Sequence, residues 1–290
     1  MITDVEGVRV GHWTDESART GCTVVLFPEG TVGSGEIRGG APATRDFAVL
    51  EPSALVQQLD AVVLSGGSTF GLAAVDGVLS WCESEGRGID TPAACVPIVV
   101  GLSLYDLSVG DASVRPRADH GRQAIEGASA DAPQSGRIGA GCGATVGKWR
   151  GRERARRSGL VTAAERDGGL VVAALVAVNA WGDPLGATPP DVGAPIHAPF
   201  ATTPAESTTI GVVATNARLT KAQCMQVARA AHAGLARSLF PVHSPFDGDA
   251  LVVGATGGHE APIEAVVPLA DRVVAAAVAS LVVGEPGDLD

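Results

Sequence analysis

Residues 207–216 read STTIGVVATN, a short apolar run rich in β-branched residues that is typical of a buried β-strand. The 25 residues from Asp183 to Ser207 contain six prolines and almost no hydrophobic periodicity, which predicts an irregular loop. Long irregular loops inside compact domains are uncommon and are usually functional. Cleavage at the end of this loop, before Thr208, would create a strand that begins with a free amine.

Other Val-rich runs bounded by glycine predict further buried strands. These runs cover residues 22–27, 61–64, 97–102, 170–178 and 251–255. Between residues 158 and 179, Arg166-Asp167-Gly168-Gly169 separates two strand-like segments and predicts a hairpin turn. At least part of the predicted sheet is therefore antiparallel.

Three segments show helical patterns. The first is expected to begin at Ser68, after LSGG, and to continue to Cys82 with apolar residues at helical spacing. In the second, Thr220 and Gln223 form a T-x-x-Q capping box, and the apolar stripe that follows ends near Pro241. The third, residues 262–283, is apolar on nearly all sides, which predicts a helix that is buried or lies at a subunit interface.

Length and composition favour one compact domain over residues 1–290, although two domains would also fit this length. The hydrophobic content of 46% is enough for one large core. The 38 glycines are nearly twice the usual share, so many backbone positions are expected to be tight or unusual.

The net charge of −11 argues against nucleic acid or an anionic membrane as a partner. One basic run, residues 150–157 with five arginines, is interpreted as a solvated hairpin or an interface loop. The N-terminal stretch MITDVEGVRVGHW lacks the basic and apolar regions of a secretion signal. Five widely spaced cysteines without metal-ligand spacing predict reduced, mostly buried thiols, and a cytoplasmic location is expected.

Six motifs in order along nearly the whole chain resemble those of a family of self-processing peptidases. This family includes L-aminopeptidase/D-amino-acid esterases, β-aminopeptidases, nylon-oligomer hydrolases and a pantetheine hydrolase. The motifs are GVRVGHW at 7–13, LSGGSTFGL at 64–72, GAGCGATVGKW at 139–149, VAVNAWGD at 176–183, STTIGVVATN at 207–216 and SPFDGD at 244–249. Each motif alone is a weak signal, whereas six in this order are specific.

The resemblance implies an α+β fold, an αββα sandwich of the N-terminal-nucleophile type in a single domain. Members of the family cleave themselves before a Ser or Thr and use that residue as the nucleophile. In this sequence the cut falls between Ser207 and Thr208, giving fragments 1–207 and 208–290. The resemblance further implies a small-molecule or peptide substrate, no cofactor, and a homo-oligomer, by analogy a tetramer.

The chemistry that the resemblance assigns to Thr208 is physically coherent. A threonine hydroxyl is a weak nucleophile until a base accepts its proton, and a free α-amine on the same residue can do so. An unperturbed α-amine has a pKa of about 7.7 to 8.0, so a useful fraction is neutral near physiological pH. The alternative is that Thr208 and Thr209 only begin a strand.

The same resemblance assigns supporting roles to four more residues. Asn179 is expected to donate its amide N–H to the developing oxyanion, and Lys148 to lower the pKa of the α-amine or to stabilise the same charge. Asp247 and Asp249 are expected to orient the α-ammonium and the hydroxyl proton. The alternatives are an Asx turn at Asn179, a surface turn for the aspartates and a solvated Lys148.

Some of these motifs also resemble other kinds of site. In GCGATVGKW, Cys142 and Trp149 stand where a phosphate-binding loop needs glycine and Ser or Thr. The glycines of LSGGSTFGL form either a tight strand-to-helix turn or an anion site. The six histidines show no metal-ligand spacing, so no metal is expected. A second functional hypothesis is an uncleaved, non-catalytic member of the same fold that binds a small molecule or serves in an assembly.

Overall fold

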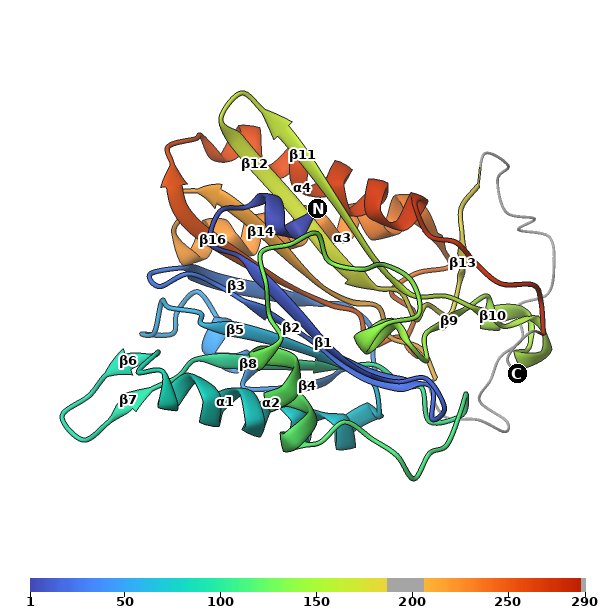
Figure 1. Ribbon diagram of the computed structural model, residues 1–290. Helices are drawn as coiled ribbons and strands as arrows, with labels where there is room; N and C mark the ends of the chain where they lie inside the picture. Colours follow the sequence, from blue (N-terminus) through green and yellow to red (C-terminus); the bar gives the residue numbers. More distant parts are fainter. Residues whose placement is uncertain (187–205, 288–290) are drawn as a thin grey trace.

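The computed structural model describes residues 1–186 and 206–287, and it shows two stacked β-sheets between two layers of helices (Figure 1). This architecture is the αββα sandwich that the sequence predicted, an α+β fold in one domain. The predicted proline-rich loop falls mostly on residues 187–205, which lie outside the described residues.

The first sheet, called sheet A, has the strand order β1-β2-β5-β8-β4. All neighbouring strands are antiparallel except β5 and β8, which are parallel. Helices α1 (Ala74–Ser84) and α2 (Ala118–Glu126) cover its outer face (Figure 1). The strands are β1 (Arg9–Asp15), β2 (Thr20–Leu26), β5 (Ala61–Ser65), β8 (Val99–Ser103) and β4 (Ala43–Arg45).

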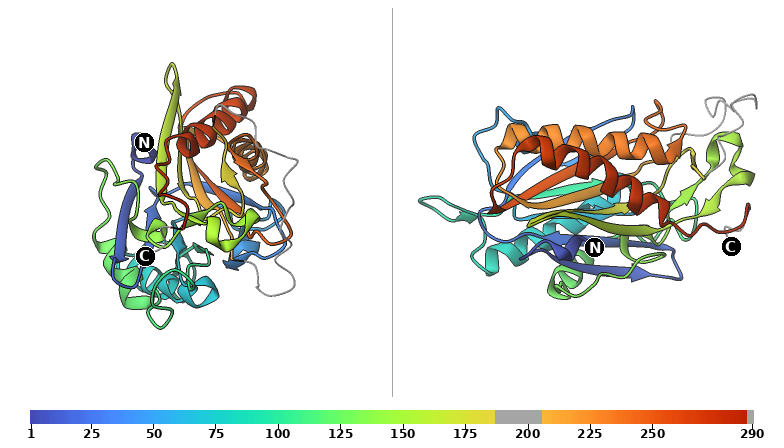
Figure 2. Two further views of the ribbon diagram at one scale, coloured as in Figure 1. Left: turned by 90° about the vertical axis from the view of Figure 1, so that its right-hand side faces the viewer. Right: turned by 90° about the horizontal axis from the view of Figure 1, so that it is seen from above.

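The second sheet, sheet B, has the order β11-β12-β14-β16-β3, and only β14 and β16 are parallel. Helices α3 (Lys221–Ser238) and α4 (Ile263–Ala279) lie side by side on its outer face (Figure 2). The strands are β11 (Leu160–Asp167), β12 (Leu170–Ala177), β14 (Ile210–Ala217), β16 (Ala250–His259) and β3 (Val32–Ile37).

Three hydrophobic clusters hold the layers together. One lies between the two sheets, where Leu64 of β5 and Val212 of β14 belong to the same buried cluster. The other two join each sheet to its own helices, as Val63 of β5 with Val78 of α1 and Val213 of β14 with Leu235 of α3. Every residue of β2 and β12 is buried because these strands face apolar layers on both sides.

Short elements complete the described chain. Two-residue strand pairs join β6 (Ile89–Asp90) to β7 (Cys95–Val96), β9 (Thr145–Val146) to β10 (Arg156–Arg157), and β13 (Asp183–Pro184) to β15 (Leu239–Phe240). The 3₁₀ helices are η1 (Ile2–Asp4), η2 (Phe47–Leu50), η3 (Ser68–Ala73), η4 (Gly139–Gly141), η5 (Lys148–Arg150) and η6 (Arg152–Arg154).

The strand predictions are confirmed, including the hairpin at residues 166–169, which joins β11 to β12. The capping box before α3 is confirmed as well, because the hydroxyl of Thr220 accepts the backbone N–H of Gln223. The helix expected from Ser68 was placed too early. Residues Ser68–Ala73 form a 3₁₀ helix, and the α-helix begins at Ala74, because Gly67 turns the chain sharply with a φ of +79°.

Two further predictions are partly wrong. The helix expected over 262–283 spans Ile263–Ala279 and is not buried on all sides, since Ala276 and Ala279 are exposed, while its alternative place at a subunit interface stays a prediction. The basic run is not simply solvated, because Arg157 is 6% exposed and its guanidinium donates to the carbonyl of Cys142. Four cysteines are buried and Cys95 is half-buried, as expected.

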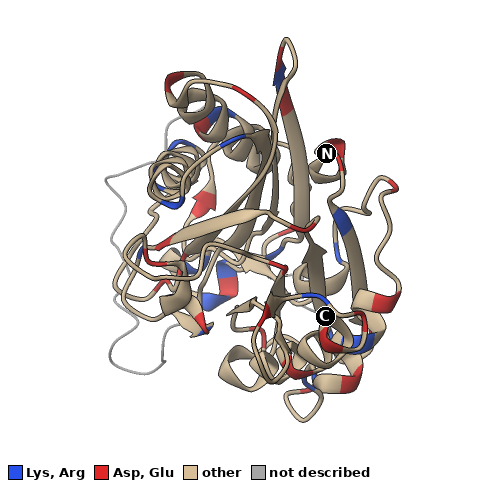
Figure 3. Ribbon diagram, turned by 90° about the vertical axis from the view of Figure 1, so that its left-hand side faces the viewer, with Lys and Arg blue, Asp and Glu red and all other residues tan. Residues whose placement is uncertain are grey.

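Charged residues of both signs are intermixed along the elements seen in Figure 3. Arg229 pairs with Glu36, and Arg272 pairs with Glu165, across different elements. Within the described ranges, no helix combines the length and the apolar character that a membrane crossing requires.

Candidate active site

One edge of sheet B gathers the predicted site residues. Strands β14 and β16 are parallel and begin at this edge, with Ile210 beside Ala250. Strands β12 and β3 run antiparallel to them and end there, since Ala177 pairs with Ile210 and Ile37 pairs with Ala250. We call this the site edge. Residues just before β14 and β16 and just after β12 and β3 therefore meet, although they are far apart in the sequence.

Thr208 lies two residues before β14 and is only 4% exposed. Its backbone N–H donates to the carbonyl of Asn179 at 2.9 Å. Its hydroxyl donates to the carbonyl oxygen of Ser207, the residue immediately before it. The amide nitrogen that a cut before Thr208 would turn into an amine therefore already faces a carbonyl acceptor.

The Ser207 carbonyl receives a second donor, the backbone N–H of Gly248, at 3.2 Å. Ser207 is 2% exposed and forms a parallel bridge with Asp247. Two donors on one buried peptide carbonyl polarise it and would stabilise a negative charge on its oxygen. The peptide bond between Ser207 and Thr208 thus sits in a setting suited to attack on its carbonyl carbon.

Asn179 follows β12 and is completely buried. Its Oδ1 accepts the backbone N–H of Thr145 and the ammonium of Lys148, both at 2.9 Å. Because Oδ1 accepts both, Nδ2 is left as the donor, and it faces the carbonyls of Tyr105 at 2.9 Å and Glu206 at 3.3 Å. The amide is held from several sides, and its Nδ2 donor points at the chain segment that precedes Ser207.

Lys148 lies in η5, and its Nζ is surrounded by oxygens. It donates to the carbonyl and hydroxyl of Thr145 at 3.1 and 2.9 Å, and to the carbonyl of Glu206 at 3.0 Å, besides its contacts with Asn179. Desolvation lowers the pKa of Lys148 to about 7, although Asp247 and Glu206 oppose that shift. This lysine is not the solvated one of the alternative interpretation.

Asp247 is 1% exposed, and both of its carboxylate oxygens accept hydrogen bonds. Oδ1 accepts the backbone N–H of Trp181 at 3.3 Å, and Oδ2 accepts the N–H and hydroxyl of Ser244 at 3.0 and 2.6 Å. Burial, followed by the nearby charge of Asp249, raises the pKa of Asp247 to about 6. Its carboxylate is therefore protonated far more easily than an ordinary aspartate.

Asp249 is also 1% exposed and lies directly before β16. Its Oδ1 accepts the backbone N–H of Thr209 at 2.7 Å, and its Oδ2 faces Nδ1 of His243 at 2.8 Å. The carboxylate thus fixes the peptide unit directly after Thr208. All five residues predicted from the sequence, with Ser207, meet at the site edge.

Sequence reasoning missed several contributions to this edge, two of which come from backbone groups. The backbone N–H of Gly248 was not considered, because a donor without a side chain leaves no mark in a motif. Residues 38–41, which follow β3, were not singled out either, although the backbone N–H groups of Arg38 and Ala41 donate to the backbone carbonyls of Asp249 and Asp247. The double glycine at 39–40 was the available signal.

The glycines allow this close approach. A Cβ added at Gly39, where φ is +107°, would lie 2.3 Å from the carbonyl oxygen of Asp247. A Cβ at Gly248 would lie 2.4 Å from the carbonyl oxygen of Ala41. Both distances are impossible for a real side chain, so the two segments pack only because both positions are glycine.

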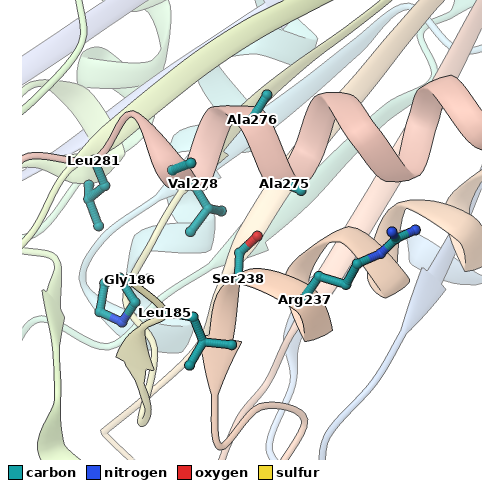
Figure 4. A pocket seen from close by; sticks show the side chains of 10 residues that line it. Leu185, Gly186, Arg237, Ser238, Ala275, Ala276, Val278 and Leu281 are labelled. Carbon is teal, nitrogen blue, oxygen red and sulfur yellow. The ribbon is translucent and has the colours of Figure 1, made fainter. Parts of the chain in front are cut away.

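The site edge is separate from a surface hollow of about 540 Å³ near the C-terminal ends of α3 and α4 (Figure 4). That hollow is lined mainly by apolar residues such as Leu185, Val278 and Leu281, with Ser238 and Arg237 as its polar side chains. None of the five site residues contributes to it. Within residues 1–186 and 206–287, no group of three or more His, Cys, Asp or Glu side chains is arranged to hold a metal ion.

The fold is that of the N-terminal-nucleophile hydrolases, as solved structures show. A β-aminopeptidase of Burkholderia sp. superimposes with a TM-score of 0.72 at 22% identity, over 96% of this chain and 84% of its own. The L-aminopeptidase D-Ala-esterase/amidase of Ochrobactrum anthropi gives a TM-score of 0.68 at 20% identity, covering 96% and 84% respectively.

The chain belongs to peptidase family S58, which matches residues 1–283. An uncharacterized aminopeptidase of Mycobacterium tuberculosis is 41% identical over 93% of this chain and 85% of its own length. A 6-aminohexanoate-oligomer endohydrolase of Kocuria sp. is 30% identical over 89% of this chain and 76% of its own. The protein is therefore a hydrolase of amide or peptide bonds, and the predicted family is confirmed.

Proposed function

We propose that the chain cleaves itself between Ser207 and Thr208, and that Thr208 then acts as an N-terminal nucleophile on small amine-bearing amides or peptides. One observation carries this proposal. The buried peptide bond before Thr208 has the Thr208 hydroxyl and the Gly248 N–H on its carbonyl oxygen, and Asn179 O on its nitrogen side. A threonine that merely began a strand would not need this arrangement.

Self-cleavage would proceed by an N-to-O acyl shift. Oγ1 of Thr208 attacks the carbonyl carbon of Ser207, and the N–H of Gly248 stabilises the oxyanion that forms. The C–N bond breaks and the hydroxyl proton ends on the Thr208 nitrogen, leaving an ester between Ser207 and Oγ1. Water then hydrolyses the ester, which gives a carboxylate at Ser207 and a free amine and hydroxyl at Thr208.

Hydrolysis of a substrate would use the same atoms. The new α-amine accepts the Oγ1 proton while Oγ1 attacks the substrate carbonyl. The carbonyl of Asn179 already faces this nitrogen and would orient the amine. An acyl-enzyme forms as the substrate amine leaves, and water releases the acid.

The donors that now hold Glu206 support this second reaction. Lys148 Nζ and Asn179 Nδ2 both face the Glu206 carbonyl in the continuous chain. Movement of the cut end away from the site would expose these two donors to a substrate oxygen. We assign Asn179 to the oxyanion on this basis, Lys148 to the same charge, and Asp247 and Asp249 to the orientation of residues 207–209.

The test is the covalent state of the purified protein. Under denaturing conditions we expect fragments of about 21 and about 8 kDa, from scaling the 29.1 kDa chain by length. N-terminal sequencing of the small fragment should read TTIGVV. An intact chain after prolonged incubation, or a cut before Thr209, would contradict the proposal and favour the uncleaved binding or assembly protein.

Substrate class is tested with one panel. Aminoacyl-p-nitroanilides, β-alanyl amides, 6-aminohexanoate oligomers and pantetheine span the substrates that the family resemblance implies. We propose an amine-bearing small substrate, a cytoplasmic location and a homo-oligomer, and light scattering of the cleaved protein measures the oligomeric state.

A further inference from the structure

His243 contacts the site edge although no motif in the sequence drew attention to it. It lies one residue before SPFDGD, in the segment between β15 and β16, and its side chain is 15% exposed. Its Nδ1 lies 2.8 Å from Oδ2 of Asp249, and its backbone N–H faces the same oxygen at 3.3 Å. Since the carboxylate oxygen accepts, Nδ1 carries the proton that the contact requires.

The imidazole of His243 is itself held in place. Its ring meets the ring of His232 in α3 edge to face, with centroids 4.9 Å apart. Its Nε2 also lies 3.4 Å from the carbonyl oxygen of His232, to which it donates only when both ring nitrogens carry a proton. The ring of His232 is fixed in turn, because its Nε2 lies 3.0 Å from the carbonyl of Glu36 in β3. The histidine pair therefore ties Asp249 to both α3 and β3.

Fixing one oxygen of Asp249 also fixes the other. Oδ1 accepts the N–H of Thr209 at 2.7 Å, and the Thr209 peptide unit begins at the carbonyl carbon of Thr208. Without the Nδ1–H, Oδ2 would keep only the longer contact with the backbone N–H of His243 at 3.3 Å. The carboxyl group would then rotate more freely about its Cβ–Cγ bond, and the Thr209 N–H would lose a well-defined acceptor. A displacement of about 1 Å at a reacting group can cost about 100-fold in rate.

We propose that His243 is a positioning residue, whose Nδ1–H orients the Asp249 carboxylate so that Asp249 holds the Thr209 peptide and thereby Thr208. This assignment rests on the reaction proposed above. The backbone of His243 is left-handed, with a φ of +54°, a conformation in which glycine and asparagine are the least strained replacements.

The backbone conformation supplies a matched pair of variants. His243→Asn keeps a short side chain with an N–H donor near the position of Nδ1, whereas His243→Gly removes the side-chain donor, keeps the backbone N–H and tolerates the same φ. His259→Asn, a half-buried histidine at the far end of β16, is the control for loss of a histidine elsewhere.

The first readout is the rate at which freshly synthesised chain is cut. We expect His243→Gly to slow cleavage by about 10- to 100-fold, and His243→Asn and His259→Asn to stay within about threefold of the parent. Cleavage of the glycine variant at the parental rate would overturn the inference. So would an asparagine variant as slow as the glycine variant, because the donor would then not be what matters.

The second readout does not depend on cleavage. In the Thr208→Ala chain, hydrogen exchange of the Thr209 amide is followed by NMR, alone and with each His243 variant. We expect faster exchange in the glycine variant and parental protection in the asparagine variant. Parental protection in both would overturn the inference. If the glycine variant does not fold, His243→Ser, too short to reach Oδ2, replaces it with the same expected outcomes.

The two readouts separate this inference from the proposed function. A parent chain that never cleaves contradicts the proposed function, while the exchange of the Thr209 amide still decides whether His243 positions Asp249. A parent that cleaves normally, with unaffected His243→Gly cleavage and exchange, leaves the proposed function intact and removes the role of His243.

Discussion

Each sheet contains one parallel strand pair, and each pair has a buried polar cluster at one end. In sheet A the cluster lies where β5 and β8 end and contains Ser65, Ser103 and Asp106. In sheet B it lies where β14 and β16 begin and contains Thr208, Asp247 and Asp249. Both clusters are apparent from burial, but their chemistry differs.

Asp106 and Asp247 illustrate the difference. Burial raises the pKa of each to about 6. Asp106 accepts the N–H of Gly67 at 2.7 Å and the hydroxyl of Thr20 at 2.8 Å, and so fixes the turn that leads into η3. Asp247 has a second carboxylate, Asp249, among the groups that raise its pKa, and its own charge opposes the lowering of the pKa of Lys148.

A raised pKa therefore does not by itself mark a catalytic aspartate, since buried structural aspartates show it too. What distinguishes the cluster in sheet B is that titrating groups of both signs converge on one peptide bond. We accordingly expect substitutions in sheet B to change reaction rates and the matched substitutions in sheet A to change stability.

The largest expected effect is at Thr208. Thr208→Ala should abolish self-cleavage and leave a folded, intact chain, whereas Thr208→Ser should keep part of it, because serine retains the hydroxyl. The matched change in sheet A, Ser65→Ala, removes a buried hydroxyl that donates to Gly66 O and Gly71 O and should lower the melting temperature with cleavage preserved. Intact-mass spectrometry and thermal unfolding measure both outcomes. Normal cleavage in the alanine variant would move the nucleophile to another residue, with Ser207 the nearest.

Asn179→Ala should have the next largest effect. Loss of one oxyanion donor commonly lowers turnover by about 100- to 1,000-fold, and we expect a loss in that range. The assay uses a substrate of the panel and mature enzyme made by co-expressing residues 1–207 with a chain that begins at Thr208, which bypasses a processing defect. Turnover within about threefold of the parent, roughly 0.7 kcal/mol of barrier, would make Asn179 a structural residue.

Much of the fold and most of the candidate site could be predicted from the sequence. The six strands and the hairpin followed from β-branched runs and glycine turns, and Thr208, Asn179, Lys148, Asp247 and Asp249 came from motifs that resemble a known family. These residues carry local signals, because a strand and the polar residue beside it are close in sequence. That these residues meet at one edge of sheet B depends on the strand order, which no local sequence pattern shows.

Features that depend on strand order could not be predicted. The parallel pairing of β14 with β16 places Gly248 N–H on the Ser207 carbonyl, and the antiparallel β3 brings Gly39 against Asp247. Neither pairing leaves a local pattern. The late start of α1 was missed because the apolar spacing from Ser68 suits a 3₁₀ helix as well as an α-helix.

Asp247 in sheet B and Asp106 in sheet A, whose pKa values are both raised to about 6, give the sharpest matched test. Asp247→Asn should slow self-cleavage by more than about tenfold, equivalent to about 1.4 kcal/mol of barrier, because it removes the charge and keeps the shape. Asp106→Asn should leave cleavage within about threefold, since the hydroxyl of Thr20 can turn to accept from the new amide. Rates of fragment formation are compared for both variants at pH 7. Equal slowing in the two would show that the clusters do not differ as we infer.

The rate of self-cleavage should also depend on pH through Asp247. Its pKa of about 6 means that the carboxylate is lost as the pH falls through about 6, and cleavage of the parent should fall with it. Asp247→Asn should show no such limb, so the ratio of parental to variant rate should decrease between pH 7 and pH 5. A constant ratio over that interval would assign the acid limb to another group.

The smallest effect is a pH-dependent change in stability at Lys148. The folded pKa of about 7 lies below the ordinary value of 10.5, because burial disfavours the ammonium. Between these values the unfolded chain binds more protons than the folded one, so the unfolding free energy should rise with pH, by at most about 1.4 kcal/mol per pH unit. Lysine and methionine at position 148 are compared in the uncut Thr208→Ala background by urea denaturation. The unfolding free energy of the lysine protein, relative to that of Lys148→Met, should increase from pH 7 to pH 9.5.

Lys221 is the matched lysine for a purely structural role. Burial also lowers its pKa, and its Nζ donates to the carbonyls of Val49 and Val56. Lys221→Met should lower stability without affecting cleavage in the Thr208 chain, whereas Lys148→Met should slow cleavage. A stability difference at Lys148 that stays constant with pH would mean that its ammonium remains charged throughout this range, and Lys148 would then stabilise the oxyanion as a permanent cation.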